Sequence, residues 1–436
     1  MLAASGAPNH RMQSSVHQTE ALLVSTLLQL VVIILAARLA GIAARRVGQS
    51  PVVGEIIAGL LLGPSLFGML APDAFSAVFS GAGREPLTIL SQVDLILLMF
   101  QVGLEFDFGH LAARHNRQAV WRIAAAGVVL PFGLGVLAGN ASASALAPGI
   151  DPLLYCLFLG TAFSITALPV LGRILLEMDL ARSRVGVIAI SAAAVTDVVG
   201  WLLLAVVTAL SAASFIGLDF VLRIAMLGAY VAACWWIVRP LLARVLGDRD
   251  GGPRPVSGNL VGLTLVVVFM SATATSLLGV FAIFGGFLVG VLLHDQPAFV
   301  KAWREKVGGF VLVFFLPIFF TYTGLRTDIG SLHCASDWGW CIALVAIATA
   351  GKFGAGYAAA RSSGLDPMES RAIGVMMNTR GLMELVVLNV GLDLGVIPPG
   401  VFTMLVIMAI LSNLLTTPAL RFWLRAADAR VPETIR

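Results

Sequence analysis

Long apolar segments constrain this chain more than any other feature of its sequence. They follow one another along most of its 436 residues, separated by short polar loops that often carry Gly or Pro. We place thirteen of them, at residues 21–44, 52–70, 87–106, 119–139, 152–173, 185–210, 219–239, 258–277, 279–294, 307–325, 338–360, 371–391 and 400–422. A helix needs about 20 apolar residues to cross a bilayer. The sequence therefore predicts an all-α, polytopic membrane protein of about 13 transmembrane helices.

The composition excludes a soluble protein. Only 12% of the residues are charged and 58% are hydrophobic, whereas a soluble domain is about 25% charged. The net charge of +4 does not indicate nucleic-acid binding, because the basic residues are spread between apolar runs along the chain. The four cysteines lie in or beside apolar runs without metal-ligand spacing.

The basic residues indicate the orientation in the membrane. If the thirteen segments span, one set of alternate loops and the C-terminal tail carry 21 Lys and Arg residues, and the opposite set carries only Arg11, Arg84 and Arg326. Cytoplasmic loops are enriched in Lys and Arg. We therefore expect a cytoplasmic C-terminus and an external N-terminus. The Arg-, Ala- and Gly-rich composition favours a bacterial source and hence the plasma or inner membrane.

The segment count also suggests an internal repeat. Thirteen divides into six, one and six, and an odd linker helix makes the second half run opposite to the first, as in inverted-repeat transporters. Segment five then corresponds to segment twelve. The predicted organisation is an external tail (1–20), one transporter domain (21–422) made of repeat 1 (21–210), a linker helix (219–239) and repeat 2 (258–422), and a cytoplasmic tail (423–436).

Two ionisable residues lie at mid-membrane depth. Lys352 is near the middle of segment eleven, and Asp197 is about halfway along segment six. Buried charges in a membrane are costly unless they are paired or hydrated, so we expect these two to pair. Burial favours the protonated carboxyl and a nearby ammonium favours the carboxylate. The Asp197 carboxyl is therefore predicted to bind either a proton or a hard cation such as Na⁺ or K⁺, and mutually exclusive occupancy is sufficient for antiport.

Helix breaks are expected in segments five and twelve. In segment five Pro169 frees a carbonyl about one turn back, and three hydroxyls surround that position, those of Thr161, Ser164 and Thr166. In segment twelve a glycine lies between Arg380 and Glu384, which are spaced to pair along a helix. Unwound membrane helices expose carbonyls and helix dipole ends to an ion at the midplane.

Structural interpretations of these residues stay open. Pro169 can mark an ordinary kink. The Arg380–Glu384 and Asp197–Lys352 pairs can serve packing rather than ion binding. Four further acidic residues are interpreted as cavity lining or as charges at helix ends: Glu55, Asp94, Glu105 and Asp107.

Several stretches, in order, resemble the monovalent cation:proton antiporter-2 family, which includes bacterial Na⁺/H⁺ and K⁺/H⁺ antiporters and plant cation/H⁺ exchangers. They cover nearly the whole chain. The stretches are Val53-Gly-Glu-Ile-Ile-Ala-Gly-Leu-Leu-Leu-Gly-Pro64, Ala167-Leu-Pro-Val-Leu-Gly-Arg-Ile-Leu175, Ser191-Ala-Ala-Ala-Val-Thr-Asp-Val198, Gly279-Val-Phe-Ala-Ile-Phe-Gly285, Gly351-Lys352 and Asn378-Thr-Arg-Gly-Leu-Met-Glu-Leu-Val-Val-Leu-Asn389.

The resemblance implies a core domain with two crossed, discontinuous helices that moves against a dimerisation domain, and hence a homodimer. Asp197 matches the ion-binding aspartate of the family, and Lys352 matches the lysine that pairs with that region. Arg380 and Glu384 match the charged motif of the second broken helix. The residue before the aspartate is usually Asp or Asn in the family and is Thr196 here. A hydroxyl can ligate a cation but cannot carry a second proton, so we expect electroneutral, one-for-one exchange.

The predicted function is cation/proton antiport without a cofactor, with a separate regulatory subunit as a possible partner. Three alternatives are weaker. A K⁺ efflux channel would need a selectivity filter, and none is recognisable. A sodium-coupled symporter of an organic anion would need more polar groups around the crossing. An intramembrane enzyme would need paired catalytic residues, and none of the six histidines lies mid-segment.

Overall fold

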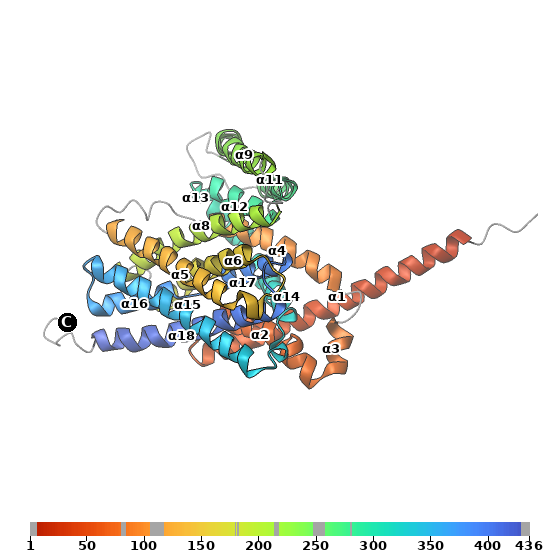
Figure 1. The fold of residues 1–436 in the computed structure, drawn as a ribbon. Coiled ribbons are helices and arrows are strands. Elements are labelled where there is room, and N and C mark those ends of the chain that lie inside the picture. The colour runs from red at the N-terminus through yellow and green to blue at the C-terminus, as the bar shows by residue number, and fades with distance from the viewer. Residues whose placement is uncertain are drawn as a thin grey trace, which may run out of the picture.

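The computed structural model describes residues 7–79, 84–104, 117–178, 180, 183–212, 218–246, 258–279 and 281–428. In these ranges all the regular secondary structure is helical (Figure 1). Ten of the described helices are long and apolar enough to cross a membrane, and three shorter apolar helices accompany them. Together they account for the thirteen predicted segments. The expected all-α, multi-pass architecture is confirmed.

The first six segments form the first half of the chain. Its helices are α1 (Ala7–Arg46), α2 (Pro51–Leu61), η1 (Pro64–Gly68), α3 (Pro72–Phe79), α4 (Arg84–Leu104), α5 (Arg117–Leu146), α6 (Pro152–Ser164), α7 (Leu168–Glu177) and α8 (Arg184–Ala212). Helix α1 begins inside the expected N-terminal tail, and its first part extends away from the other helices (Figure 1). The short helix α3 lies in a loop where the sequence predicts no helix.

The remaining segments are also helical. Segment seven, the predicted linker, corresponds to α9 (Leu218–Ala233), η3 (Cys234–Val238) and α10 (Arg239–Leu246). The second half comprises α11 (Gly258–Leu277), α12 (Ala282–Leu293), α13 (Pro297–Trp303), η4 (Arg304–Gly308), η5 (Val311–Phe315), α14 (Leu316–Leu325), η6 (Ile329–Ser331), α15 (Ala335–Ser362), α16 (Pro367–Met377), α17 (Leu382–Asp393) and α18 (Pro399–Asp428). The segments η1, η3, η4 and η5 are π-helical, and η6 is a 3₁₀ turn.

Packing divides the helices into two groups. In the first group α1, α2, α4, α11, α12 and α14 contact one another extensively, and in the second group α5 to α8 pack with α15 to α18. Each group contains three segments from each half of the chain. Contacts between the groups are fewer and include α2 with α18. Such a division allows the two groups to move relative to each other while each keeps its own core.

Segment five is broken between α6 and α7, as the sequence predicts. Residues 165–167 are not helical, and α7 begins at Leu168 with Pro169 as its second residue. Proline is tolerated in the first helical turn because the N–H groups there have no intrahelical acceptor. The proline therefore begins a new half-helix after the break.

Segment twelve is broken between α16 and α17. The break contains Gly381, whose φ of 155° is rarely adopted by residues with a side chain. A Cβ atom at this position would lie 3.0 Å from both Asn413 Nδ2 and Val170 Cγ2. Glycine is therefore required both for the backbone conformation and for the close approach of α7 and α18.

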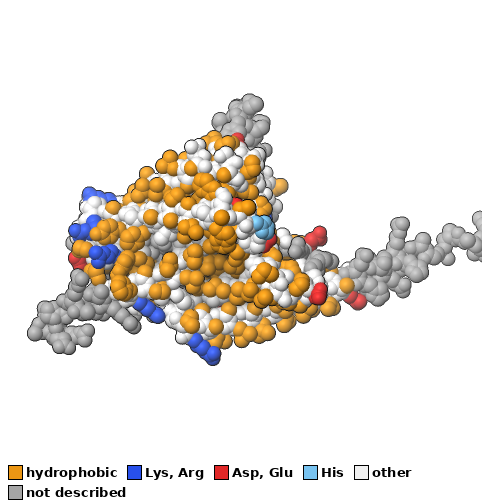
Figure 2. All heavy atoms as spheres, turned by 60° about the horizontal axis from the view of Figure 1, so that its bottom comes forward, with side chains coloured by type: hydrophobic (Ala, Val, Ile, Leu, Met, Phe, Trp, Pro, Cys, Tyr) orange, Lys and Arg blue, Asp and Glu red, His pale blue; other side chains and the backbone are white. Residues whose placement is uncertain are grey.

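The surface is that of a membrane protein. Figure 2 shows hydrophobic side chains over most of one face, with most of the visible Lys and Arg side chains toward the left end and others along the lower edge. Large apolar side chains on α1, α5 and α8 are more than half exposed, for example Val31, Val129 and Leu202 at 62%, 70% and 62%. Exposed apolar area of this kind on helices of spanning length fits contact with lipid.

Candidate ion-binding site

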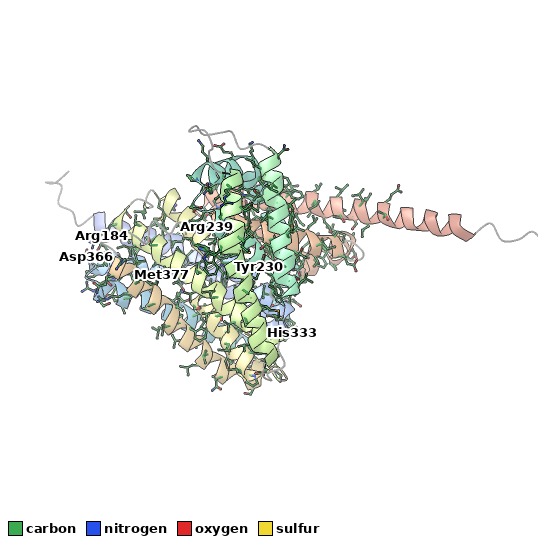
Figure 3. All side chains as sticks on the ribbon, turned by 90° about the horizontal axis from the view of Figure 1, so that it is seen from above. Arg184, Tyr230, Arg239, His333, Asp366 and Met377 are labelled. Atoms are coloured by element: carbon green, nitrogen blue, oxygen red, sulfur yellow. The ribbon has the colours of Figure 1, made fainter. Side chains whose placement is uncertain are left out.

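The two broken helices meet at their breaks. The backbone N–H of Ala167 donates to the carbonyl of Thr379 over 2.9 Å, and the Thr166 hydroxyl donates to the carbonyl of Met377 over 3.1 Å. Figure 3 places Met377 inside the bundle, between the end marked by Arg184 and Asp366 and the end marked by His333. The breaks therefore form a crossing at the interior of the protein.

Asp197 lies on α8, which packs against α5, α6, α7 and α16. Its side chain is only 3% exposed, and neither carboxyl oxygen has a hydrogen-bond partner among the described residues. The first residue of α7, Leu168, presents its backbone N–H toward this carboxyl. A helix N-terminus carries a partial positive charge that stabilises an anion. The site thus offers two free oxygens beside a favourable dipole, and it is suited to bind one proton or one cation.

Two buried cationic side chains, those of Lys352 and Arg380, lie on the α6 side of the break in segment five. Lys352 Nζ donates to the carbonyl oxygens of Gly127, over 2.7 Å, and of Ser164. Arg380 donates to the carbonyls of Ala162 and Phe163 over 3.0 and 3.2 Å. The last carbonyls of a helix have no intrahelical donor and carry partial negative charge. Lys352 and Arg380 together satisfy the C-terminal end of α6.

The expected ion pair between Lys352 and Asp197 is not formed in the described structure. The Lys352 ammonium is hydrogen-bonded to backbone carbonyls, and the Asp197 oxygens have no partner. The two charges are nevertheless close enough to influence each other. The difference arises because α6 ends at Ser164 and its carbonyls compete for the ammonium. The sequence shows that segment five is interrupted but does not show which donor reaches the carbonyls freed at the end of α6.

Arg380 and Glu384 form the predicted pair. Arg380 Nη1 donates to Glu384 Oε1 over 2.8 Å, and both side chains are fully buried. Glu384 lies in the first turn of α17, where a carboxylate is favoured by the helix dipole. The second oxygen of Glu384, Oε2, has no partner among the described residues. The pair therefore joins α6 to α17 and leaves one acceptor atom unused.

The candidate hydroxyls bond mainly to their own helices. Thr161 donates to the carbonyl of Leu157 and Ser164 to that of Thr161, both over 2.8 Å. Thr196 donates to the carbonyl of Ala193 over 2.9 Å. Thr166 is the exception, because its donor bond crosses to Met377 on α16. All four hydroxyl oxygens keep lone pairs, but the structure gives none of them a bond to Asp197.

Sequence reasoning missed Asn413 on α18. Its side chain is 1% exposed, both of its polar atoms are unpartnered among the described residues, and it lies against Gly381 at the break. Thr379 Oγ1 and Asn378 Oδ1, in the same break, are also unpartnered. The sequence signal that could have identified Asn413 is an amide side chain inside the apolar segment 400–422.

Comparison with known proteins agrees with this geometry. Residues 31–426 match the family model described as "Sodium/hydrogen exchanger, transmembrane". The chain belongs to the sodium/hydrogen exchanger family. It is thus a multi-pass membrane protein of a transporter family, as the sequence predicts.

Individual relatives extend over the same region. The Na⁺/H⁺ antiporter NhaS4 of Synechocystis is 38% identical over 90% of this chain and 95% of its own. Cation/H⁺ antiporter 17 of Arabidopsis thaliana is 36% identical over 90% of this chain, which spans only 47% of that longer protein. The structure of the sodium proton antiporter MjNhaP1 of Methanocaldococcus jannaschii has a TM-score of 0.66, with 13% identity, 93% coverage of this chain and 99% of its own. The inverted-repeat antiporter fold is therefore confirmed.

Proposed function

We propose that this exchanger-family protein is a secondary active transporter that exchanges a monovalent cation, Na⁺ or K⁺, for H⁺ by alternating access, with Asp197 binding each in turn. One observation carries the proposal. The Asp197 carboxyl is buried at the crossing with both oxygens free and with the N-terminal end of α7 beside it. The names of the relatives, which are cation/proton antiporters, support the same reaction.

The remaining charges at the crossing act as fixed counter-charges. Lys352 and Arg380 stay hydrogen-bonded to α6, and Glu384 stays paired with Arg380. Proton exchange is then left to Asp197, because the Thr196 hydroxyl does not ionise in the physiological range. One proton released for one cation bound is electroneutral. Movement of the group formed by α5 to α8 and α15 to α18 against the first group would expose Asp197 to either side.

Orientation and partners belong to the same proposal. The Lys and Arg side chains at one end of the molecule (Figure 2) support a cytoplasmic C-terminus and an external N-terminus. We place the protein in the plasma or inner membrane of a bacterium, as a homodimer that has no cofactor and is open to control by a separate regulatory subunit. Cross-linking of the purified protein in lipid tests the dimer.

Proton flux in liposomes tests the function. Purified protein is reconstituted with an internal pH dye under an imposed pH gradient, and NaCl or KCl is added, with valinomycin at fixed K⁺ to clamp the voltage. We expect cation-dependent proton flux that is insensitive to voltage, is abolished in Asp197→Asn and is retained in Asp73→Asn, a variant on the surface helix α3. Undiminished flux in Asp197→Asn would overturn the role of Asp197. Cation flux without proton flux would favour a channel, and cation uptake that requires an organic anion would favour a symporter.

A further inference from the structure

One face of α4 carries buried polar groups that the crossing does not use. Ser91, Asp94 and Gln101 are 0%, 0% and 7% exposed. Ser91 Oγ, both carboxyl oxygens of Asp94 and Gln101 Oε1 have no hydrogen-bond partner among the described residues. Their spacings of three and seven residues place them on the same face of the helix. Asp94, which the sequence predicts to line a cavity or to lie near a helix end, is fully buried in the middle of α4.

This face lies against segment ten. Leu87, one heptad before Asp94, belongs to the same buried apolar cluster as Ile318 on α14. Gln101, one heptad after Asp94, lies 3.4 Å from where a Cβ of Gly308 would be. Helix α4 also packs against η5. Asp94 lies midway along α4 between these two residues, and segment ten includes η5, a π-helical turn that α4 contacts. Such turns occur frequently at functional sites.

Asp94 has no cationic partner on the elements packed around it. Helices α11, α12 and α14 and the turn η5 contain no Asp, Glu, Lys, Arg or His. Tyr322 is the one titratable side chain of α14, and its hydroxyl accepts a hydrogen bond from Arg326. Charged residues close to η5 lie on other elements. Arg38 on α1 donates to the carbonyl of Val313 and is 3.5 Å from Glu55 on α2, and η4, which contacts η5, carries Arg304, Glu305 and Lys306. None of these five residues lies on an element that contacts α4 extensively.

The chemistry of these buried groups selects a proton. A carboxylate without a counter-charge costs several kcal/mol or more when it is removed from water, and the group neutralises by protonation instead. A dehydrated alkali cation would need more oxygens than Ser91 and Asp94 supply. A proton needs one carboxyl oxygen, and the resulting acid can donate to the Ser91 hydroxyl one turn away.

We propose that Asp94, assisted by Ser91, is a second proton-binding site, located in the helix group that does not contain Asp197. Loss of this proton places an uncompensated charge in the buried surroundings of α4, so the packing around α4 is coupled to pH. The site is independent of whether Asp197 carries the exchanged ion, since the two residues lie in different helix groups.

Infrared spectroscopy of the full-length protein in lipid tests the site without measuring transport. We expect the C=O stretching band of a protonated carboxylic acid to persist at neutral pH in the wild type and in Asp197→Asn. The band should be absent in Asp94→Asn, which keeps the shape of the neutral acid, and shifted in frequency in Ser91→Ala. A protonated-acid band at neutral pH that is the same in Asp94→Asn as in the wild type would overturn the proposal, as would no such band in any variant.

Exchange measured against pH provides a second readout. Asp94→Asn should still exchange cation for proton, but its pH profile should lose a step that Asp73→Asn retains. A profile identical to that of the wild type would contradict coupling of the site to transport. Because the infrared result does not need an active exchanger, a failure of the antiport assignment would show in the flux assay alone.

Discussion

The Lys352 ammonium donates a hydrogen bond to the carbonyl of Ser164, the residue at which α6 ends. The same ammonium donates to Gly127 on α5. Lys352 therefore holds two helices at the crossing and compensates the negative end of one half-helix. Asp197 is left with two unpartnered oxygens. The lysine positions the crossing, and the aspartate is free to bind and release an ion.

This assignment predicts different phenotypes for Lys352 and Asp197. Lys352→Met removes the donor from two buried carbonyls and should lower the free energy of unfolding by about 1–3 kcal/mol. Asp197→Asn removes the ion-binding charge and should leave the melting temperature in detergent within a few degrees of the wild type. Thermal unfolding monitored by intrinsic fluorescence measures both. Equal stability of Lys352→Met and the wild type would contradict the role in holding α6.

The Arg380–Glu384 pair should be more sensitive to loss of one partner than of both. Removing one member of a buried pair costs about 3–5 kcal/mol, because the other charge stays uncompensated. Arg380→Ala should therefore destabilise strongly, and Arg380→Met combined with Glu384→Gln should recover part of the loss. Arg380→Lys should not restore stability, since a single ammonium cannot reach Glu384 and the carbonyls of α6 together. Additive effects in the double variant would show that the two side chains act separately.

Arg326 joins the two helix groups at one side of the protein. From the end of α14 it pairs with Asp393 on α17 and donates to Asn389, whose amide donates to Thr323. Arg326→Gln should weaken the contact between the two helix groups on this side by about 1 kcal/mol, a small effect because the ion pair is partly exposed. A Thr403→Cys variant without the exposed Cys334 measures this, since Thr403 on α18 is buried and its hydroxyl accepts a hydrogen bond from the backbone N–H of Asp328.

We expect faster maleimide labelling of Thr403→Cys when Arg326→Gln is added. Arg239→Gln is the matched control, because it breaks a comparable ion pair with Asp295 that does not join the two groups. If both variants label at the same rate as the parent, Arg326 does not restrain the opening of this side.

Gly381 should tolerate no side chain. Gly381→Ala adds a Cβ to a residue at φ 155° and places it 3.0 Å from Asn413 and Val170, so we expect a loss of about 1–3 kcal/mol. Gly354 on α15 provides the control, since it is helical and a Cβ there meets no atom within 4 Å. Gly354→Ala should be neutral or stabilising by about 0.5–1 kcal/mol. Denaturation curves in detergent that show equal losses would contradict this account of the break.

The fold could be predicted from the sequence to an unusual extent because a membrane imposes a length on every helix. The segment boundaries and the breaks beside Pro169 and Gly381 follow from apolar runs interrupted by helix breakers. The partners of the buried charges could not be predicted. Lys352 bonds to carbonyls that become available only because α6 stops at Ser164, and that contact brings together residues 188 positions apart. The isolation of Asp94 is likewise a property of the helices around it.

The pH dependence of the cation affinity tests the central claim most directly. If cation and proton compete for the Asp197 carboxyl, the KM for the cation should rise about tenfold for each unit that the pH falls below the titration of the site, while the maximal rate at saturating cation stays constant. Solid-supported membrane currents or isotope uptake at several pH values measure both quantities, with Asp94→Asn as background to remove the second titration. The predicted result is a KM for the cation that rises in proportion to the proton concentration. A KM independent of pH, with only the maximal rate changing, would contradict binding of both ions at Asp197.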